Sequence, residues 1–175
     1  IIQNRLSEEI SAGIQTFQYQ INTLQTSNGQ APFLSVLMYI EDGSEYEEET
    51  AMLVEEMLNQ RIKGMQNEVG AWITPAFPKL LYVTDTNNTY SGSKYYYLTE
   101  LAAKCVAKRM MPDFLSAKKL RENYGDIVPP MGCRAFLSPY TGPINNEEGK
   151  LKWWGRFNMG LTSINLADAG LSAQG

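Results

Sequence analysis

The sequence predicts an α/β fold in which at least part of the sheet is parallel. Apolar residues recur at helical spacing in three stretches, and two short apolar runs lie between them. Helix and strand patterns therefore alternate along the chain, which favours parallel strands joined by crossover helices. The chain has 175 residues, 43% hydrophobic and 19% charged, so it is long enough for one domain with a sizeable core.

The first helix is predicted to begin at Ser7 and to end at the polar stretch 26–29. Ser7 is a suitable N-cap, and Glu8 and Glu9 complement the positive end of the helix dipole. The apolar residues of this helix recur at steps of three and four, at Ile10, Ile14, Phe17, Ile21 and Leu24. Residues 32–40 are then almost continuously apolar, which is typical of a strand buried on both faces.

The second helix is predicted to start at the acidic triplet 47–49. Acidic residues at a helix start usually compensate the dipole, although the triplet also leaves a metal-binding role open. The apolar positions of this helix are Ala51, Val54, Leu58, Ile62 and Met65. Gly64 and Gly70 mark its end, and residues 72–75 are predicted to be a connector.

A second strand is predicted at residues 79–84, followed by a loop over residues 85–93. Asn87, Asn88 and Thr89 in that loop are interpreted as a turn rather than a glycosylation site.

The third predicted helix spans residues 95–111 and ends before Pro112. Its apolar face contains Leu98, Leu101, Cys105 and Val106, so Cys105 is interpreted as a core residue. Residues 114–128 are polar and weakly periodic, and no regular element is predicted there. The last predicted strand is at residues 157–166.

Composition and charge exclude several classes of function. The net charge is −4 and no run of Lys or Arg occurs, so nucleic acid and anionic membranes are poor partners. No apolar run approaches the roughly 20 residues of a membrane span, and no signal peptide is present. Two cysteines without a CxxC pair indicate a reducing compartment, so we expect a cytoplasmic protein. The absence of histidine excludes Ser-His and Cys-His activation of a nucleophile by these residues.

One cysteine is set in a stretch typical of a loop tip. Pro129 and Pro130 stiffen the approach to Cys133, Gly132 allows close backbone approach, and Pro139 ends any regular element beyond it. If the tip is extended, Met131 and Cys133 point the same way, because side chains two positions apart share a face. On this local pattern alone, a presented thiol and a small buried hydrophobe both remain open.

Residues 130–137, together with 155–166, resemble the finger-loop cysteine and the following strand of the anaerobic (class III) ribonucleotide reductases, which are glycyl-radical enzymes. Residues 25–33, 75–80 and 107–113 resemble further segments of that family, in the same order. The likeness extends over nearly the whole chain, and five segments in register are far more specific than any one motif.

The resemblance implies a ten-stranded α/β barrel made of two half-barrels, with a finger loop at its centre. Residues 1–175 would be a fragment of one catalytic barrel domain, with the finger loop at about residues 126–140 and the N- and C-terminal parts of the family absent. The chain opens on Ile1 and stops at Gly175, and family members are several times longer. We therefore expect a fragment, a subunit of a split enzyme or an excised segment, inactive alone.

The resemblance also implies roles for individual residues. Cys133 would become the thiyl radical that abstracts the 3′ hydrogen of a ribonucleotide, with Met131 packed beside the sulfur. Asn158, in a Gly-Arg-x-Asn motif, would contact the sugar hydroxyls. The other candidate substrate-binding residues are Thr26, Ser27 and Arg156. Each of these residues also has a structural alternative. Asn158 could be a buried strand residue bonded to the backbone, and residues 26–27 could only cap a turn. Arg156 could form an ordinary structural ion pair.

The implied cofactors and partners lie mostly outside this chain. The amide of Asn158 resembles the formate-using branch, so formate is the expected reductant. The glycyl-radical segment, the second active-site cysteine and the four-cysteine zinc site of the family have no counterpart here. A ribonucleoside triphosphate, the remaining parts of the reductase, a radical S-adenosylmethionine activase and a second copy of the complete enzyme are the implied partners. Allosteric control and a role in DNA precursor synthesis are implied as well.

Two other functions compete with ribonucleotide reduction. A glycyl-radical enzyme of the pyruvate formate-lyase kind also holds a finger-loop cysteine, but the motifs at residues 26–30 and 155–158 argue against it. The other rival is a non-catalytic α/β scaffold, which would keep its binding when Cys133 is replaced by Ser.

Overall fold

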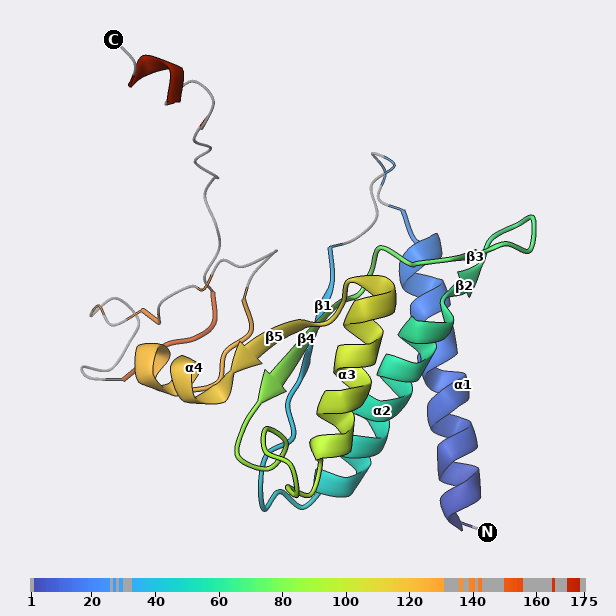
Figure 1. Cartoon of the computed structure of the whole chain (residues 1–175), viewed down its shortest axis with the longest axis horizontal. Coiled ribbons are helices and arrows are strands. Elements are labelled where there is room, and N and C mark those ends of the chain that lie inside the picture. Colours follow the sequence, from blue (N-terminus) through green and yellow to red (C-terminus); the bar gives the residue numbers. More distant parts are fainter. Residues whose placement is uncertain are drawn as a thin grey trace.

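The computed structural model describes residues 2–25, 27, 29, 33–130, 136, 139–140, 142, 150–155, 165 and 170–173. Its helices and strands alternate as the sequence predicts (Figure 1). They are α1 (Ile2–Thr23), β1 (Ser35–Met38), α2 (Glu47–Lys63), β2 (Met65–Gln66), β3 (Trp72–Ile73), β4 (Lys79–Thr84), α3 (Tyr96–Arg109), β5 (Asp113–Ser116) and α4 (Ala117–Tyr124). None of these helices is long and apolar enough to span a membrane.

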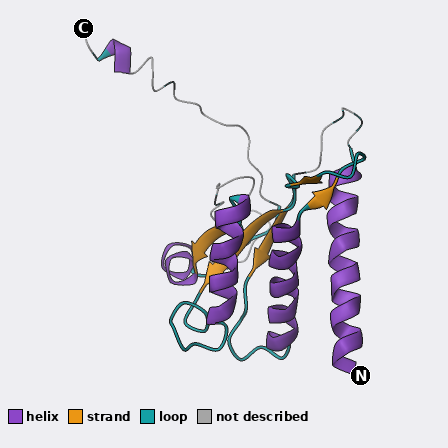
Figure 2. Ribbon diagram, turned by 45° about the vertical axis from the view of Figure 1, so that its right-hand side comes forward, coloured by secondary structure: helices purple, strands orange, loops and turns teal. Residues whose placement is uncertain are grey.

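The main sheet has three parallel strands in the order β1-β4-β5. Val36 pairs with Leu80 in one ladder, and Tyr82 pairs with Phe114 in the other. Helices α2 and α3 pack together over one face of the sheet, and α1 packs against α2 (Figures 1 and 2). The predicted α/β class with a parallel sheet is therefore confirmed, whereas the ten-stranded barrel stays a prediction.

The core lies between the sheet and the two covering helices. The central strand contributes Leu80 and Tyr82, and the helices contribute Leu58, Leu98 and Cys105, all fully buried. Full burial of a leucine side chain stabilises the fold by about 1.5 to 3 kcal/mol. The predicted core position of Cys105 is confirmed: its thiol donates to the carbonyl oxygen of Leu58 at 3.8 Å.

The start of the first helix differs from the prediction. Helix α1 begins at Ile2, so Ser7 lies inside the helix and the proposed N-cap there is wrong. Leu6 is partly buried and continues the four-residue apolar spacing ahead of Ile10, which extends the amphipathic face toward the N-terminus.

The predicted connector at residues 72–75 contains a short strand instead. Strand β3 pairs antiparallel with β2, with Met65 opposite Ile73. The turn between them is fixed by Asn67, whose side-chain oxygen accepts from the backbone N–H of Val69 and Ala71. A two-residue strand is too short to show alternation in the sequence. Gly64 does end α2 as predicted, with a φ of 88°.

Residues 114–128 differ most from the prediction: no regular element is predicted there, but they contain most of β5 and all of α4. Strand β5 is the last strand of the sheet among the described residues, and its Phe114 and Ser116 are exposed, so its sequence carries little apolar signal. Helix α4 has its own boundary signals: Ser116 caps its N-terminus and Gly125 ends it in the left-handed conformation. The predicted strand at residues 157–166 lies outside the described residues, apart from Asn165.

Candidate functional site at the carboxyl edge of the sheet

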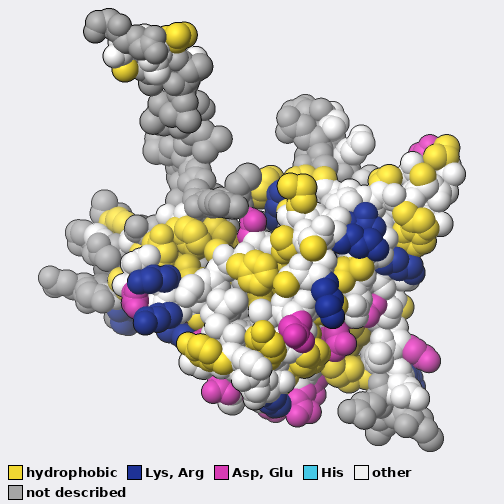
Figure 3. Space-filling model, in the orientation of Figure 1, with side chains coloured by type: hydrophobic (Ala, Val, Ile, Leu, Met, Phe, Trp, Pro, Cys, Tyr) yellow, Lys and Arg dark blue, Asp and Glu magenta, His cyan; other side chains and the backbone are white. Residues whose placement is uncertain are grey.

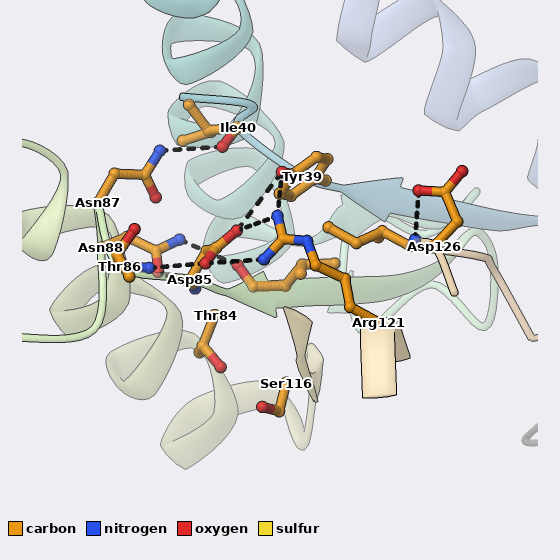
Figure 4. Close-up of polar contacts among 12 residues, drawn as sticks. Tyr39, Ile40, Thr84, Asp85, Thr86, Asn87, Asn88, Ser116, Arg121 and Asp126 are labelled. Atoms are coloured by element: carbon orange, nitrogen blue, oxygen red, sulfur yellow. Dashed lines mark hydrogen bonds and ion pairs between the residues drawn. The ribbon is translucent and has the colours of Figure 1, made fainter. Parts of the chain in front are cut away.

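Three polar side chains meet where the parallel strands end. Tyr39 directly follows β1, Asp85 directly follows β4, and Arg121 comes from α4, which directly follows β5 (Figure 4). The carboxyl ends of parallel strands lie at one edge of a sheet, which is where ligands of open α/β sheets usually bind. We call these residues the Tyr39–Asp85–Arg121 cluster.

The guanidinium of Arg121 makes the central contacts of the cluster. Its Nη2 lies 2.7 Å from Oδ2 of Asp85, and its Nη1 lies 3.2 Å from Oδ1, so the pair is bidentate. The same Nη2 donates to the phenol oxygen of Tyr39 at 2.9 Å. The phenol in turn donates to Oδ2 of Asp85 at 3.4 Å, which closes the triangle.

The loop that follows β4 fixes both the carboxylate and the backbone of Asp85. The backbone N–H of Thr86 donates to Oδ1 of the carboxylate at 2.9 Å. The backbone N–H of Asp85 donates to the side-chain oxygen of Asn88, whose amide donates back to the carbonyl of Val83. Asn87 donates to the carbonyl of Ile40, which links the loop to the end of β1. Asn88 is 1% exposed, so this part of the loop is buried and fixed. The predicted turn at residues 87–89 is confirmed.

The charges of the cluster follow from these contacts. The hydrogen bond from Arg121 holds the pKa of Asp85 below its ordinary value, so the carboxylate is ionised at neutral pH. Burial raises the pKa of Tyr39, so the phenol stays protonated. The bond to Asp85 raises the pKa of Arg121. The result is an ion pair with a neutral phenol, which can orient groups but offers no acid or base that titrates near pH 7.

Helix α4 connects the cluster to the predicted finger loop. After Gly125 the chain continues through Asp126, whose carboxylate accepts from the N–H of Ile127 at 2.7 Å, to the buried residues Val128 and Pro130. Phe136, on the far side of Cys133 in the sequence, stacks on Tyr124, the last residue of α4. The ring centroids are 5.1 Å apart and the planes differ by 18°. Both described ends of this stretch therefore lie close to the end of α4.

The outer face of α4 is basic. Lys118, Lys119 and Arg121 are exposed. Dark blue side chains gather over the region of α4 in Figure 3. Lys119 is paired with Glu122 on the same helix at 2.6 Å. In the part of the chain that the structure describes, no three His, Cys, Asp or Glu side chains form a group able to hold a metal ion.

A second polar cluster lies at the opposite end of β4. Arg61 of α2 is 0% exposed, and its two terminal nitrogens donate to the carbonyl oxygens of Pro75 and Pro78, just before β4 begins. Arg109, at the end of α3, donates to the carbonyl of Ile62 and to the hydroxyl of Thr74, each at 2.9 Å. These two arginines fix the segment that leads into the central strand.

Most sequence-predicted site residues lie outside the described residues. These are Thr26, Met131, Cys133, Arg156 and Asn158. Ser27 is described: it is exposed, in the connection before β1 and therefore at the amino end of that strand. The functional assignments of all six residues stay predictions.

The Tyr39–Asp85–Arg121 cluster is not predicted by the sequence patterns. A signal for one of its members was present, because Asp85 is the first residue after the predicted strand at residues 79–84, whereas Tyr39 lies within the predicted strand at residues 32–40. Arg121 could not be placed, since β5 and α4 had not been predicted.

Comparison with known proteins gives a consistent result. The family model for the anaerobic ribonucleoside-triphosphate reductase matches residues 2–175. The chain is 36% identical over 167 residues to the anaerobic ribonucleoside-triphosphate reductase of Enterobacteria phage T4, covering 94% of this chain and 26% of that protein. It is 35% identical over 173 residues to the protein of the same name from Escherichia coli, covering 98% and 23%. It is 34% identical over 174 residues to that of Salmonella typhimurium, covering 99% and 23%. The chain thus spans about a quarter of the length of these relatives.

Proposed function

This chain belongs to the anaerobic ribonucleoside-triphosphate reductase family, and we propose that it forms part of the catalytic domain of an enzyme that reduces ribonucleoside triphosphates to deoxyribonucleotides. The observation that carries the proposal is the match to the family model across residues 2–175. Because the chain spans about a quarter of its relatives, the activity would belong to the assembled enzyme.

We propose Cys133 as the residue that attacks the substrate. As a thiyl radical, its sulfur would take the hydrogen atom from C3′, forming an S–H bond and leaving a C3′ radical. The 2′ hydroxyl would take up a proton and leave as water, and formate would supply the two electrons of the reduction. The other cysteine is unsuited to this role, because Cys105 is fully buried among core residues, where a substrate cannot reach its sulfur. The contacts at the end of α4 support a positioned loop around Cys133.

The proposed substrate contacts come from the family motifs. Met131 would pack beside the sulfur, and the amide of Asn158 would both donate to and accept from the sugar hydroxyls. Arg156, Thr26 and Ser27 would bind the substrate, with the arginine suited to a phosphate by its planar fork of donors. Ser27 is exposed, so its hydroxyl is free of any packing that would hide it.

The remaining parts of the enzyme would supply the radical and the metal. A four-cysteine zinc site does not fit this chain, which has two cysteines and no histidine, so zinc would be held elsewhere in the enzyme. The glycyl radical would likewise come from outside these residues, generated by a radical S-adenosylmethionine activase. Formate as reductant, allosteric control and a homodimer of the complete enzyme complete the proposal.

The test is anaerobic turnover of a labelled ribonucleoside triphosphate by the assembled enzyme. Cys133→Ser should abolish formation of the deoxynucleotide while the circular dichroism spectrum stays unchanged. Cys105→Ala is the matched control and should retain turnover, because a core cysteine does not touch substrate. If the unmodified enzyme forms no deoxynucleotide, the proposal is wrong. Cleavage of a keto acid in that case would favour an enzyme of the pyruvate formate-lyase kind.

A further inference from the structure

Helix α4 is held to the rest of the fold by few apolar contacts. It has eight residues, and only Ala117 and Leu120 are buried. A helix of this length is not stable in water by itself, so its position depends on what anchors it. Its polar anchor is Arg121, since the Lys119–Glu122 pair lies within the helix and fixes it to nothing else.

The anchor reaches two strands at once. Arg121 binds Asp85 after β4 and Tyr39 after β1, two strands paired in the sheet (Figure 4). The partners are rigid, because the loop of Asp85 is hydrogen-bonded to Asn88 and to the strand end. A bidentate guanidinium fixes direction as well as distance, which a lysine ammonium does not.

The same helix holds the base of the stretch that contains Cys133. Arg121 and Tyr124 are three residues apart and therefore lie on one face of α4. Tyr124 stacks on Phe136, and the chain that leaves the helix is buried at Val128 and Pro130. Cys133 lies between Pro130 and Phe136 in the sequence. A rotation of α4 would therefore displace both ends of this stretch together.

We propose that Arg121, acting through Asp85 and Tyr39, is a positioning residue that fixes α4 and thereby the base of the loop bearing Cys133. The inference rests on the proposed function only in that Cys133 is taken as the reacting thiol. Radical transfer between a sulfur and one substrate carbon depends on their separation, and a misplacement of about 1 Å can cost on the order of a hundredfold in rate.

The test compares Arg121→Gln with Lys119→Gln in the complete enzyme, by hydrogen exchange and by turnover. The lysine variant is the matched control, because it removes an ion pair from the same helix without touching β1 or β4. We expect Arg121→Gln to raise backbone exchange about fivefold at Gly125 and Ile127, whose N–H groups are hydrogen-bonded at the end of α4. It should also lower kcat by about tenfold, with KM within about twofold. The lysine variant should change neither measurement. Arg121→Lys should restore part of kcat.

Exchange that is unchanged in Arg121→Gln, or raised equally in Lys119→Gln, would overturn the inference. If Arg121→Gln does not fold, Tyr39→Phe takes its place, since it removes only the phenol oxygen that Arg121 binds; unchanged exchange in that variant would then overturn it. Hydrogen exchange can be measured without turnover. It therefore tests whether Arg121 fixes α4 even if the unmodified enzyme makes no deoxynucleotide. That last outcome would refute the proposed function alone.

Discussion

The two ends of the central strand β4 are each fixed by an arginine, but in opposite ways. Arg61, at the amino end, is fully buried and donates to the backbone carbonyls of Pro75 and Pro78. Arg121, at the carboxyl end, has a side chain that is 46% exposed and is paired with the carboxylate of Asp85. The arginine at the amino end of β4 is thus part of the buried core. The arginine at the carboxyl end is exposed to solvent, on the helix that leads into the following chain.

This difference separates stability from positioning. Removing a buried donor leaves its acceptors without water or protein partners, which costs more than the bond itself contributed. An exposed ion pair, by contrast, exchanges its partner for water at little cost. We therefore expect Arg61 to govern the stability of the fold and Arg121 to govern the placement of one helix.

The largest expected effect is that of Arg61→Met. The substitution keeps an apolar stem but leaves the carbonyls of Pro75 and Pro78 unpaired in the core, so we expect a loss of about 3 to 5 kcal/mol of folding stability. Urea unfolding followed by circular dichroism measures it. Arg5→Gln is the control and should leave the midpoint unchanged, because Arg5 is 80% exposed. A loss below about 1 kcal/mol would mean that burial of the charge cancels the two bonds.

Arg109→Gln should have an intermediate effect, because Arg109 is only partly buried. Its guanidinium donates to the carbonyls of Ile62 and Lys63 at the end of α2 and to the hydroxyl of Thr74. Water can reach part of this site after the substitution, so we expect a loss of about 1 to 2 kcal/mol in the same unfolding measurement. A loss equal to that of Arg61→Met would show that the exposure of each arginine does not determine how much stability its substitution removes.

At the carboxyl end, Arg121→Gln should lower global stability by about 1 kcal/mol or less. The effect of the cluster should instead depend on pH. The hydrogen bond from Arg121 lowers the pKa of Asp85 from its ordinary value of 3.8. A lowered pKa contributes stability that is present above 3.8 and is lost as pH falls through the folded-state value.

The difference in urea midpoint between the unmodified protein and Asp85→Asn measures this contribution. It should be constant above about pH 5 and should disappear in acid, as Asp85 takes up its proton. The difference caused by Arg61→Met should stay constant over the same range, because its acceptors are carbonyls that do not titrate. A pH-independent Asp85→Asn difference would show that the ion pair contributes nothing.

The two ends of the strand also differ in how far the sequence predicts them. Strand β4 and its turn were predictable, since a continuous apolar run before Asp85 and Asn88 leaves little choice of structure. The positions of Arg61 and Arg121 could not be predicted from the sequence. Arg61 lies on a helix with an ordinary polar pattern, and its burial is decided by the distant segment at residues 75–78. Arg121 lies on a short polar helix, whose position is set by contacts with residues 36 and 82 positions away.

The reactivity of Cys105, which reports opening of the core, can test whether Arg61 stabilises the core and Arg121 does not. Cys105 is fully buried and its pKa is raised to about 11, so at pH 8 only roughly one thiol in a thousand is ionised. Its reaction with iodoacetamide should therefore require unfolding of the core. Mass spectrometry of the labelled peptide follows that reaction without interference from Cys133.

Arg61→Met should accelerate the labelling of Cys105 by a factor that grows exponentially with the stability it removes, about fivefold for each kcal/mol, because opening of the core precedes alkylation. Arg121→Gln should change the rate by no more than about fivefold, since a loss near 1 kcal/mol corresponds to a factor of that size. If Arg121→Gln accelerated labelling as strongly as Arg61→Met, the two ends of β4 would open as one unit. The carboxyl end would then be part of the core, and α4 could not shift independently of it.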